Sequence, residues 1–143
     1  MTADECMKIF VQVALAFQVI HKNDIMHRQI SPDHLLMSDS QGTKVTLTGF
    51  SDLRDEVKSD SIISTFTVKN SFLPPEVMQG AEYSKSADIW GLGVLLSTMG
   101  AGGRTPYILH ESGDVMIKAV GEEKQHFVGG FPEQFNSLVD RMM

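Results

Sequence analysis

The alternation of apolar and polar residues predicts that the chain begins with a long helix followed by a β-hairpin. Between residues 2 and 21 the apolar positions recur at helical spacing, and Thr2 and Glu5 have the spacing of a capping box at the start of this helix. Residues 34–38 and 44–48 are short runs with strand character, separated by residues typical of a turn. We therefore expect a helix and then two paired strands.

The second half of the chain predicts further helices. Residues 49–72 are polar and lack a clear period, so a long loop is expected there. A short helix is predicted at 74–78, a strong one at 86–99, and two more at 111–120 and 132–142. The predicted fold class is therefore mainly α with a small β-hairpin.

Two glycines, Gly91 and Gly93, lie inside the strong helix predicted at 86–99. Each costs a helix interior up to about 1 kcal/mol relative to alanine, so a helix that keeps both needs a reason for them. The simplest reason is close packing against a neighbour. We expect other parts of the chain to contact this helix at both glycines.

Composition and charge fit one ordinary domain that covers residues 1–143. The net charge of −6 argues against a nucleic-acid-binding groove. The single cysteine excludes an internal disulfide, and no apolar run reaches the roughly 18 residues of a membrane helix. Asp4 and Glu5 stand where a secretory signal peptide has basic residues. We expect a soluble, cytoplasmic protein without membrane contact.

Five short motifs follow one another in the order and spacing of a known family. They are HRQISPDHLL (27–36), TGFS (48–51), PPEV (74–77), SADIWGLGVLL (86–96) and RTPY (104–107). Together they resemble the catalytic loop, the D-F-G motif, the A-P-E motif, the central helix and the following loop of eukaryotic-type protein kinases. NIMA-related and calcium/calmodulin-type serine/threonine kinases are candidate branches. The resemblance implies a protein-kinase-like C-lobe, incomplete at both ends and without the N-lobe.

The resemblance implies that several structural residues of the family are present, namely His27, Arg28, Phe50, Glu76, Asp88 and Trp90. Asp88 is expected to be buried and to accept hydrogen bonds from the backbone near His27 and Arg28. In the family, His27 and Phe50 belong to an apolar column, and Arg28 pairs with a phosphorylated loop. Glu76 pairs with an arginine that this sequence does not reach. Leu36 matches the residue beneath the adenine ring.

The positions that carry phosphoryl transfer in the family are substituted here: Gln29, Ser31, His34 and Gly49. Gln29 replaces the aspartate that accepts the substrate proton, and an amide cannot act as a base. Gly49 and His34 replace the two residues that hold Mg²⁺, which prefers oxygen ligands. Ser31 replaces the lysine that steadies the transferred phosphate. No metal site is expected, and ATP and Mg²⁺ enter by family resemblance only.

Some residues near these positions leave other ligands and modifications open. Asp33 and Asp52 are nearby carboxylates that could supply a metal ligand in place of the missing ones. His34 could bind zinc with His27 or His21, although the spacing does not match a known zinc site. Several serines and threonines of the predicted loop could be phosphorylated and meet Arg28: Ser59, Ser61, Ser64, Thr65 and Thr67.

Taken together, the sequence predicts a pseudokinase piece that acts as an interaction or scaffold module with a protein partner. The alternative is a part of an active or atypical serine/threonine kinase that transfers the γ-phosphate of ATP to proteins, and a third possibility is a fragment without independent function. Self-association is expected through the surface that would face the N-lobe, around Phe10, Phe17, Leu35, Leu36, Met37 and Phe50.

Overall fold

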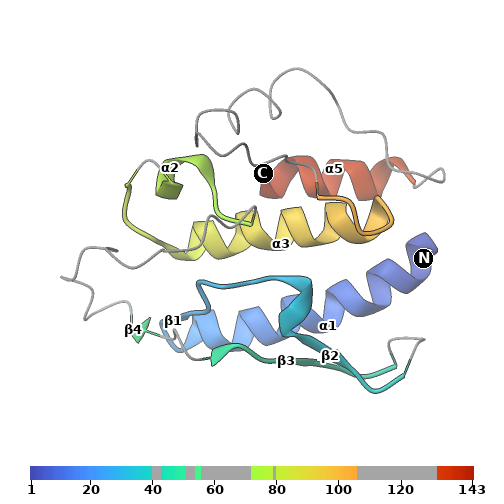
Figure 1. Cartoon of the computed structure of the whole chain (residues 1–143), viewed down its shortest axis with the longest axis horizontal. Coiled ribbons are helices and arrows are strands. Elements are labelled where there is room, and N and C mark those ends of the chain that lie inside the picture. The colour runs from blue at the N-terminus through green and yellow to red at the C-terminus, as the bar shows by residue number, and fades with distance from the viewer. Residues whose placement is uncertain (40–42, 51–53, 56–71, 79, 106–131) are drawn as a thin grey trace.

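A computed structural model describes residues 1–39, 43–50, 54–55, 72–78, 80–105 and 132–143 (Figure 1). In these ranges the chain is mostly helical and carries two small antiparallel sheets. The elements are α1 (Ala3–Lys22), β1 (Ile25–Met26), the 3-10 helix η1 (Pro32–His34), β2 (Leu35–Met37), β3 (Val45–Leu47), β4 (Arg54–Asp55), α2 (Pro75–Met78), α3 (Lys85–Gly100) and α5 (Glu133–Met142).

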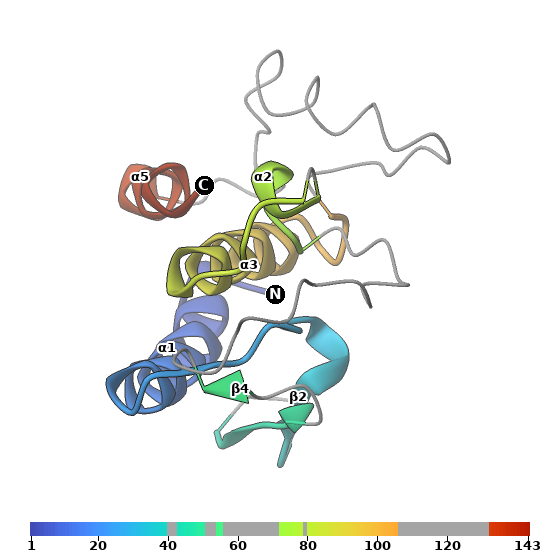
Figure 2. The ribbon, with the colours of Figure 1, turned by 90° about the vertical axis from the view of Figure 1, so that its left-hand side faces the viewer.

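The helix α3 is the centre of the molecule. It lies between α1 and α5 in both views of the ribbon (Figures 1 and 2), and every residue from Trp90 to Gly100 is buried. A helix that is apolar on all sides is stable only when neighbours surround it, which is the arrangement seen here. The predicted helix at 86–99 is confirmed and extends by one residue at each end.

The two glycines of α3 mark its closest contacts. A Cβ atom built on Gly91 would lie 2.2 Å from Cγ2 of Ile30 and 3.2 Å from the carbonyl oxygen of Phe72. A Cβ atom built on Gly93 would lie 2.8 Å from Cγ of Met143, in the last turn after α5. The prediction that both glycines allow close packing is confirmed.

The helix α1 begins with the predicted capping box, in which the Thr2 backbone N–H donates to Glu5 Oε2 (2.7 Å) and the Glu5 backbone N–H donates to Thr2 Oγ1 (3.2 Å). Phe10 and Phe17 face the core, with only 6% and 1% of their surfaces exposed. The expectation that these two phenylalanines form an outer, N-lobe-facing surface is therefore wrong. The exposed apolar residues of α1 are Val11, Leu15 and Val19.

The predicted hairpin is confirmed as β2 and β3, which pair Leu35 with Leu47 and Met37 with Val45. A second pair, β1 with β4, joins Ile25 to Asp55 and was not predicted. Each of its strands has two residues, which is too short to show a period in the sequence. Because β4 falls inside 49–72, the prediction of one continuous loop there is wrong at this point.

The other predicted helices have different outcomes. The short helix at 74–78 and the last helix at 132–142 are confirmed as α2 and α5. The helix predicted at 111–120 lies outside the described residues. None of the helices in the part of the chain that the structure describes is long and apolar enough to cross a membrane.

Candidate functional site

The carboxylate of Asp88 joins the start of α3 to the segment after β1. It is fully buried and accepts two hydrogen bonds on each oxygen. Oδ1 accepts from the Arg28 backbone N–H (2.9 Å) and the Tyr83 hydroxyl (2.7 Å). Oδ2 accepts from the His27 backbone N–H (2.9 Å) and from Nε2 of His21 (2.7 Å). The expected bonds to the backbone at residues 27 and 28 are confirmed, and they provide the pairing that a buried charge requires.

Two of these partners, His21 and Tyr83, were not predicted to contact Asp88. Burial, and after it the charge of Asp88, raises the pKa of the Tyr83 hydroxyl far above its ordinary value. The hydroxyl therefore stays protonated and donates a hydrogen bond to Asp88. Arg28 is also buried, and its guanidinium lies over the Tyr83 ring, 5.7 Å from the ring centroid. Arg28 has a backbone φ of +67°, a conformation that costs a non-glycine residue about 1–3 kcal/mol. The hydrogen bond from its backbone N–H to Asp88 helps to hold the backbone at Arg28 in this conformation.

The imidazole of His27 links three parts of the fold. Its Nε2 lies 2.8 Å from the carbonyl oxygen of Thr48, and its ring contacts Phe17 of α1 and Phe50 after β3, with centroids 5.4 and 5.3 Å away. Burial lowers the pKa of His27, so a neutral ring that donates from Nε2 fits its surroundings. His27 and Phe50 are in contact, as members of one apolar column require. Phe17, which the motifs did not mark, also contacts the His27 ring.

The substituted positions Gln29, Ser31, His34 and Gly49 come together in one cluster. Nδ1 of His34 lies 2.6 Å from the backbone carbonyl oxygen of Gln29, to which it donates, and 3.4 Å from Oγ of Ser31. The other side of the cluster is Gly49, which has a positive φ of +85°. A Cβ atom built on Gly49 would lie 2.6 Å from the imidazole of His34.

These residues do not fit a bound Mg²⁺ ion. Gly49 has no side-chain oxygen, and the imidazole of His34 occupies the space where a side chain at residue 49 would lie. Asp33 is exposed on η1, and Asp52 lies outside the described residues. Among the described residues no three His, Cys, Asp or Glu side chains are placed to hold a metal ion, so the zinc alternative through His21 and His27 gains no support.

The remaining predicted residues lie at separate places. Trp90 is buried in the core, Glu76 is exposed on α2, and Leu36 is exposed on β2, where it pairs with Thr46. The loop serines and threonines from Ser59 to Thr67 lie outside the described residues.

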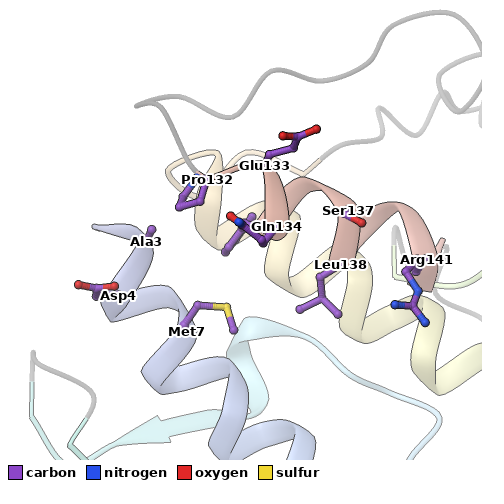
Figure 3. A pocket seen from close by; sticks show the side chains of 10 residues that line it. Ala3, Asp4, Met7, Pro132, Glu133, Gln134, Ser137, Leu138 and Arg141 are labelled. Atoms are coloured by element: carbon purple, nitrogen blue, oxygen red, sulfur yellow. The ribbon is translucent and has the colours of Figure 1, made fainter.

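A hollow of about 730 Å³ lies between the start of α1 and α5 (Figure 3). Met7 and Leu138 project into it from the two helices, and both also pack against the core. Its wall contains no residue of the Asp88 network or of the substituted cluster; it is lined by Ala3, Asp4, Met7, Pro132, Glu133, Gln134, Phe135, Ser137, Leu138 and Arg141.

Comparison with known proteins agrees with the motifs. The chain is 31% identical over 133 residues to the cAMP-dependent protein kinase catalytic subunit 2 of Drosophila melanogaster, covering 92% of this chain and 36% of that protein. It is 37% identical over 102 residues to the testis-specific serine/threonine-protein kinase 1 of Homo sapiens, covering 69% of this chain and 28% of that protein. The matched residues thus span only about a third of the length of such relatives. Because all of residues 1–143 match the protein kinase domain family, the chain belongs to that family.

Proposed function

We propose that this chain is a catalytically inactive protein-kinase-like domain that acts as an interaction or scaffold module. The observation that carries the proposal is the cluster in which the imidazole of His34 lies against Gly49 and donates to the carbonyl oxygen of Gln29. The order of elements and motifs supports assigning the described part to a kinase C-lobe. In that assignment, all the chemistry of phosphoryl transfer in this lobe falls on the substituted positions.

The chemistry of the three side chains explains why transfer is not expected. Phosphoryl transfer depends on positioning and on neutralising charge, for which kinases use two Mg²⁺ ions held by oxygen ligands. Neither His34 nor Gly49 supplies such an oxygen, and the amide of Gln29 cannot accept the substrate proton. The loss of a general base alone typically lowers a rate by about 10²–10⁴-fold.

The contacts that support the site around Asp88 and His27, by contrast, are present. The carboxylate of Asp88 accepts four hydrogen bonds, and the ring of His27 contacts both Phe17 and Phe50. A site that keeps its supporting contacts but lacks its reacting groups suits a domain that stays folded in order to bind a protein partner. This contrast favours a scaffold role over a fragment without function.

The alternative proposal is a working or atypical serine/threonine kinase. The names of the relatives favour it, because the Drosophila and human proteins are both named as kinases. In such an enzyme, residues outside the substituted cluster would have to supply the base and the metal ligands, since the side chains of the cluster offer neither; Asp33 and Asp52 are the nearby carboxylates. ATP and Mg²⁺ would then be its cofactors by family resemblance.

The absence of Mg²⁺-dependent kinase activity is the first prediction. We expect the purified chain to transfer no more phosphate from radiolabelled ATP than its Gln29→Ala/His34→Ala variant, both to generic protein substrates and to itself. The variant is the matched control because it removes the side chains that could act in an unusual way. Transfer by the unmodified chain above this control would overturn the proposed function and favour the kinase alternative.

Self-association through the hairpin is the second prediction. Leu36 and Met37 are more than half exposed, at 59% and 52%. At about 25 cal/mol per Å², burying an apolar patch of about 300 Å² is worth several kcal/mol before the cost of association is subtracted. We therefore expect light scattering to show concentration-dependent association of the chain, and a Leu36→Ser/Met37→Ser variant to stay monomeric.

A second double variant, Val11→Ser/Leu15→Ser, is the control for this prediction. These two side chains are also exposed, at 47% and 55%, but they lie on α1. If the hairpin is the interface, this variant associates as the unmodified chain does. A monodisperse monomer at high concentration, or loss of association only in the α1 variant, would contradict the prediction.

A further inference from the structure

We propose that His34 closes the position of residue 49 to any side chain, so that the two substitutions act as one steric unit. A Cβ atom on Gly49 would lie 2.6 Å from both Cγ and Cδ2 of His34 and 2.9 Å from its Nδ1. Carbon atoms in ordinary contact are about 3.5–4.0 Å apart. Alanine at residue 49 already requires the imidazole to move, and aspartate requires more room.

The imidazole has little freedom to move away. The atoms nearest to residue 49 include Cγ, the first atom of the ring, which moves away only if the side chain changes its χ1 rotamer. Nδ1 is fixed by its 2.6 Å hydrogen bond to the carbonyl oxygen of Gln29. The backbone of His34 is fixed as well, because its carbonyl oxygen accepts from both the N–H (2.8 Å) and the hydroxyl (3.1 Å) of Thr48. The ring is therefore held at both ends.

The position of Gly49 is set by the same elements. Leu35 pairs with Leu47 in the β2–β3 ladder, so Thr48 is opposite His34 and Gly49 follows directly. The bonds from Thr48 to His34 then bring the backbone at residue 49 onto the imidazole face. With a φ of +85°, Gly49 adopts a conformation that side chains rarely allow. The ring at residue 34 therefore fits only because residue 49 is a glycine.

This contact has a consequence for the family's metal position. The inference rests on the proposed function in taking residues 34 and 49 as the two positions that hold Mg²⁺ in active kinases. Here direct packing joins these positions, and the volume between them is filled. The site is therefore closed by shape as well as by missing ligands. Restoring aspartate at residue 49 alone cannot reopen it while His34 remains.

A double-mutant cycle on melting temperature tests the coupling. The four proteins are the unmodified chain, Gly49→Ala, His34→Ala and the double variant. The strain from the positive φ at residue 49 is present in both backgrounds and cancels. Gly49→Ala should lower the melting temperature in both backgrounds. We expect this loss to be smaller, by roughly 3 °C or more, when residue 34 is alanine. Equal losses in both backgrounds would overturn the inference.

A second comparison covers the case in which His34→Ala does not fold. Gly49→Asp and His34→Asn/Gly49→Asp are melted with and without Mg²⁺ as the probe. We expect the double variant to melt at a higher temperature than Gly49→Asp, so that the added substitution stabilises the protein, and only the double variant to respond to Mg²⁺. A single variant that melts at or above the double one would overturn the inference.

The two proposals fail separately. Phosphate transfer by the unmodified chain would overturn the proposed function and leave the steric coupling of His34 and Gly49 intact. Additive melting losses would overturn the coupling and leave the inactivity of the chain unaffected. The stability measurements therefore test the contact without depending on any catalytic readout.

Discussion

Replacing Asp88 with alanine is expected to lower the free energy of unfolding by about 3–5 kcal/mol, the cost of breaking a buried, fully bonded charged group. The carboxylate is fully buried and its oxygens accept from His21, His27, Arg28 and Tyr83. Its removal takes this acceptor away from two backbone N–H groups and a tyrosine hydroxyl, all of them buried. Since each such group costs about 1–3 kcal/mol, the variant should unfold at much lower denaturant concentration.

An exposed aspartate provides the control for this experiment. Asp140 lies on the outer face of α5, and Asp140→Ala should change stability by no more than about 0.5 kcal/mol. Asp88→Asn is an intermediate case, because the amide keeps one acceptor oxygen and adds donors where only donors are present. Denaturant unfolding followed by Trp90 fluorescence measures all three variants. Equal midpoints for Asp88→Ala and Asp140→Ala would contradict the importance of the network.

Half of this network was predictable from the sequence. The motif around residue 88 and the motif beginning at His27 resemble those of protein kinases, and this resemblance implied the bonds to the backbone at residues 27 and 28. His21 and Tyr83 had no such signal. His21 is the last but one residue of α1 and contacts a residue 67 positions away in sequence, and Tyr83 lies in the irregular segment before α3. The packing of α1 against α3 brings His21 to Asp88, whereas Tyr83 reaches the carboxylate from five residues earlier in the chain.

The substituted cluster shows a similar division. Each of Gln29, His34 and Gly49 could be recognised as a change from the kinase pattern, because each stands at a fixed place in a motif. Their mutual contact could not be recognised. It depends on the register of β2 with β3 and on the rotamer of one imidazole, and neither is encoded in local spacing. The sequence therefore identified what is missing, and the fold shows what fills the space.

The phenylalanines of α1 illustrate where the sequence pattern misleads. The apolar positions of this helix cover a wide arc, which includes Phe10 and Phe17 and also Leu15 and Val19. A wide arc establishes that much of the helix is covered without saying which part faces the core. The two rings pack inward with α3, while Leu15 and Val19 remain exposed. Tertiary contacts, and not the periodicity, decide this choice.

Replacing Gly91 with alanine is expected to destabilise the protein by about 1–3 kcal/mol, the usual cost of overpacking a core. The new Cβ atom would lie 2.2 Å from Cγ2 of Ile30 and 3.2 Å from the carbonyl oxygen of Phe72. Cγ2 belongs to a β-branched side chain with a stiff χ1, and the carbonyl is backbone, so neither can move at low cost. The gain in helix propensity, up to about 1 kcal/mol, does not offset this clash.

Gly93→Ala is the matched control on the same helix. Its Cβ atom would meet Cγ of Met143 at 2.8 Å and Cβ of Met142 at 3.0 Å, at the end of the described chain. Methionine is unbranched and adapts to new neighbours, so relaxation should recover much of the propensity gain. In thermal unfolding, the melting temperature of Gly91→Ala should therefore be well below that of Gly93→Ala. Ile30→Ala should reduce the loss caused by Gly91→Ala, because it removes the methyl group in the way. Equal melting temperatures for the two glycine variants would mean that α3 does not pack on Ile30 as closely as the structure shows.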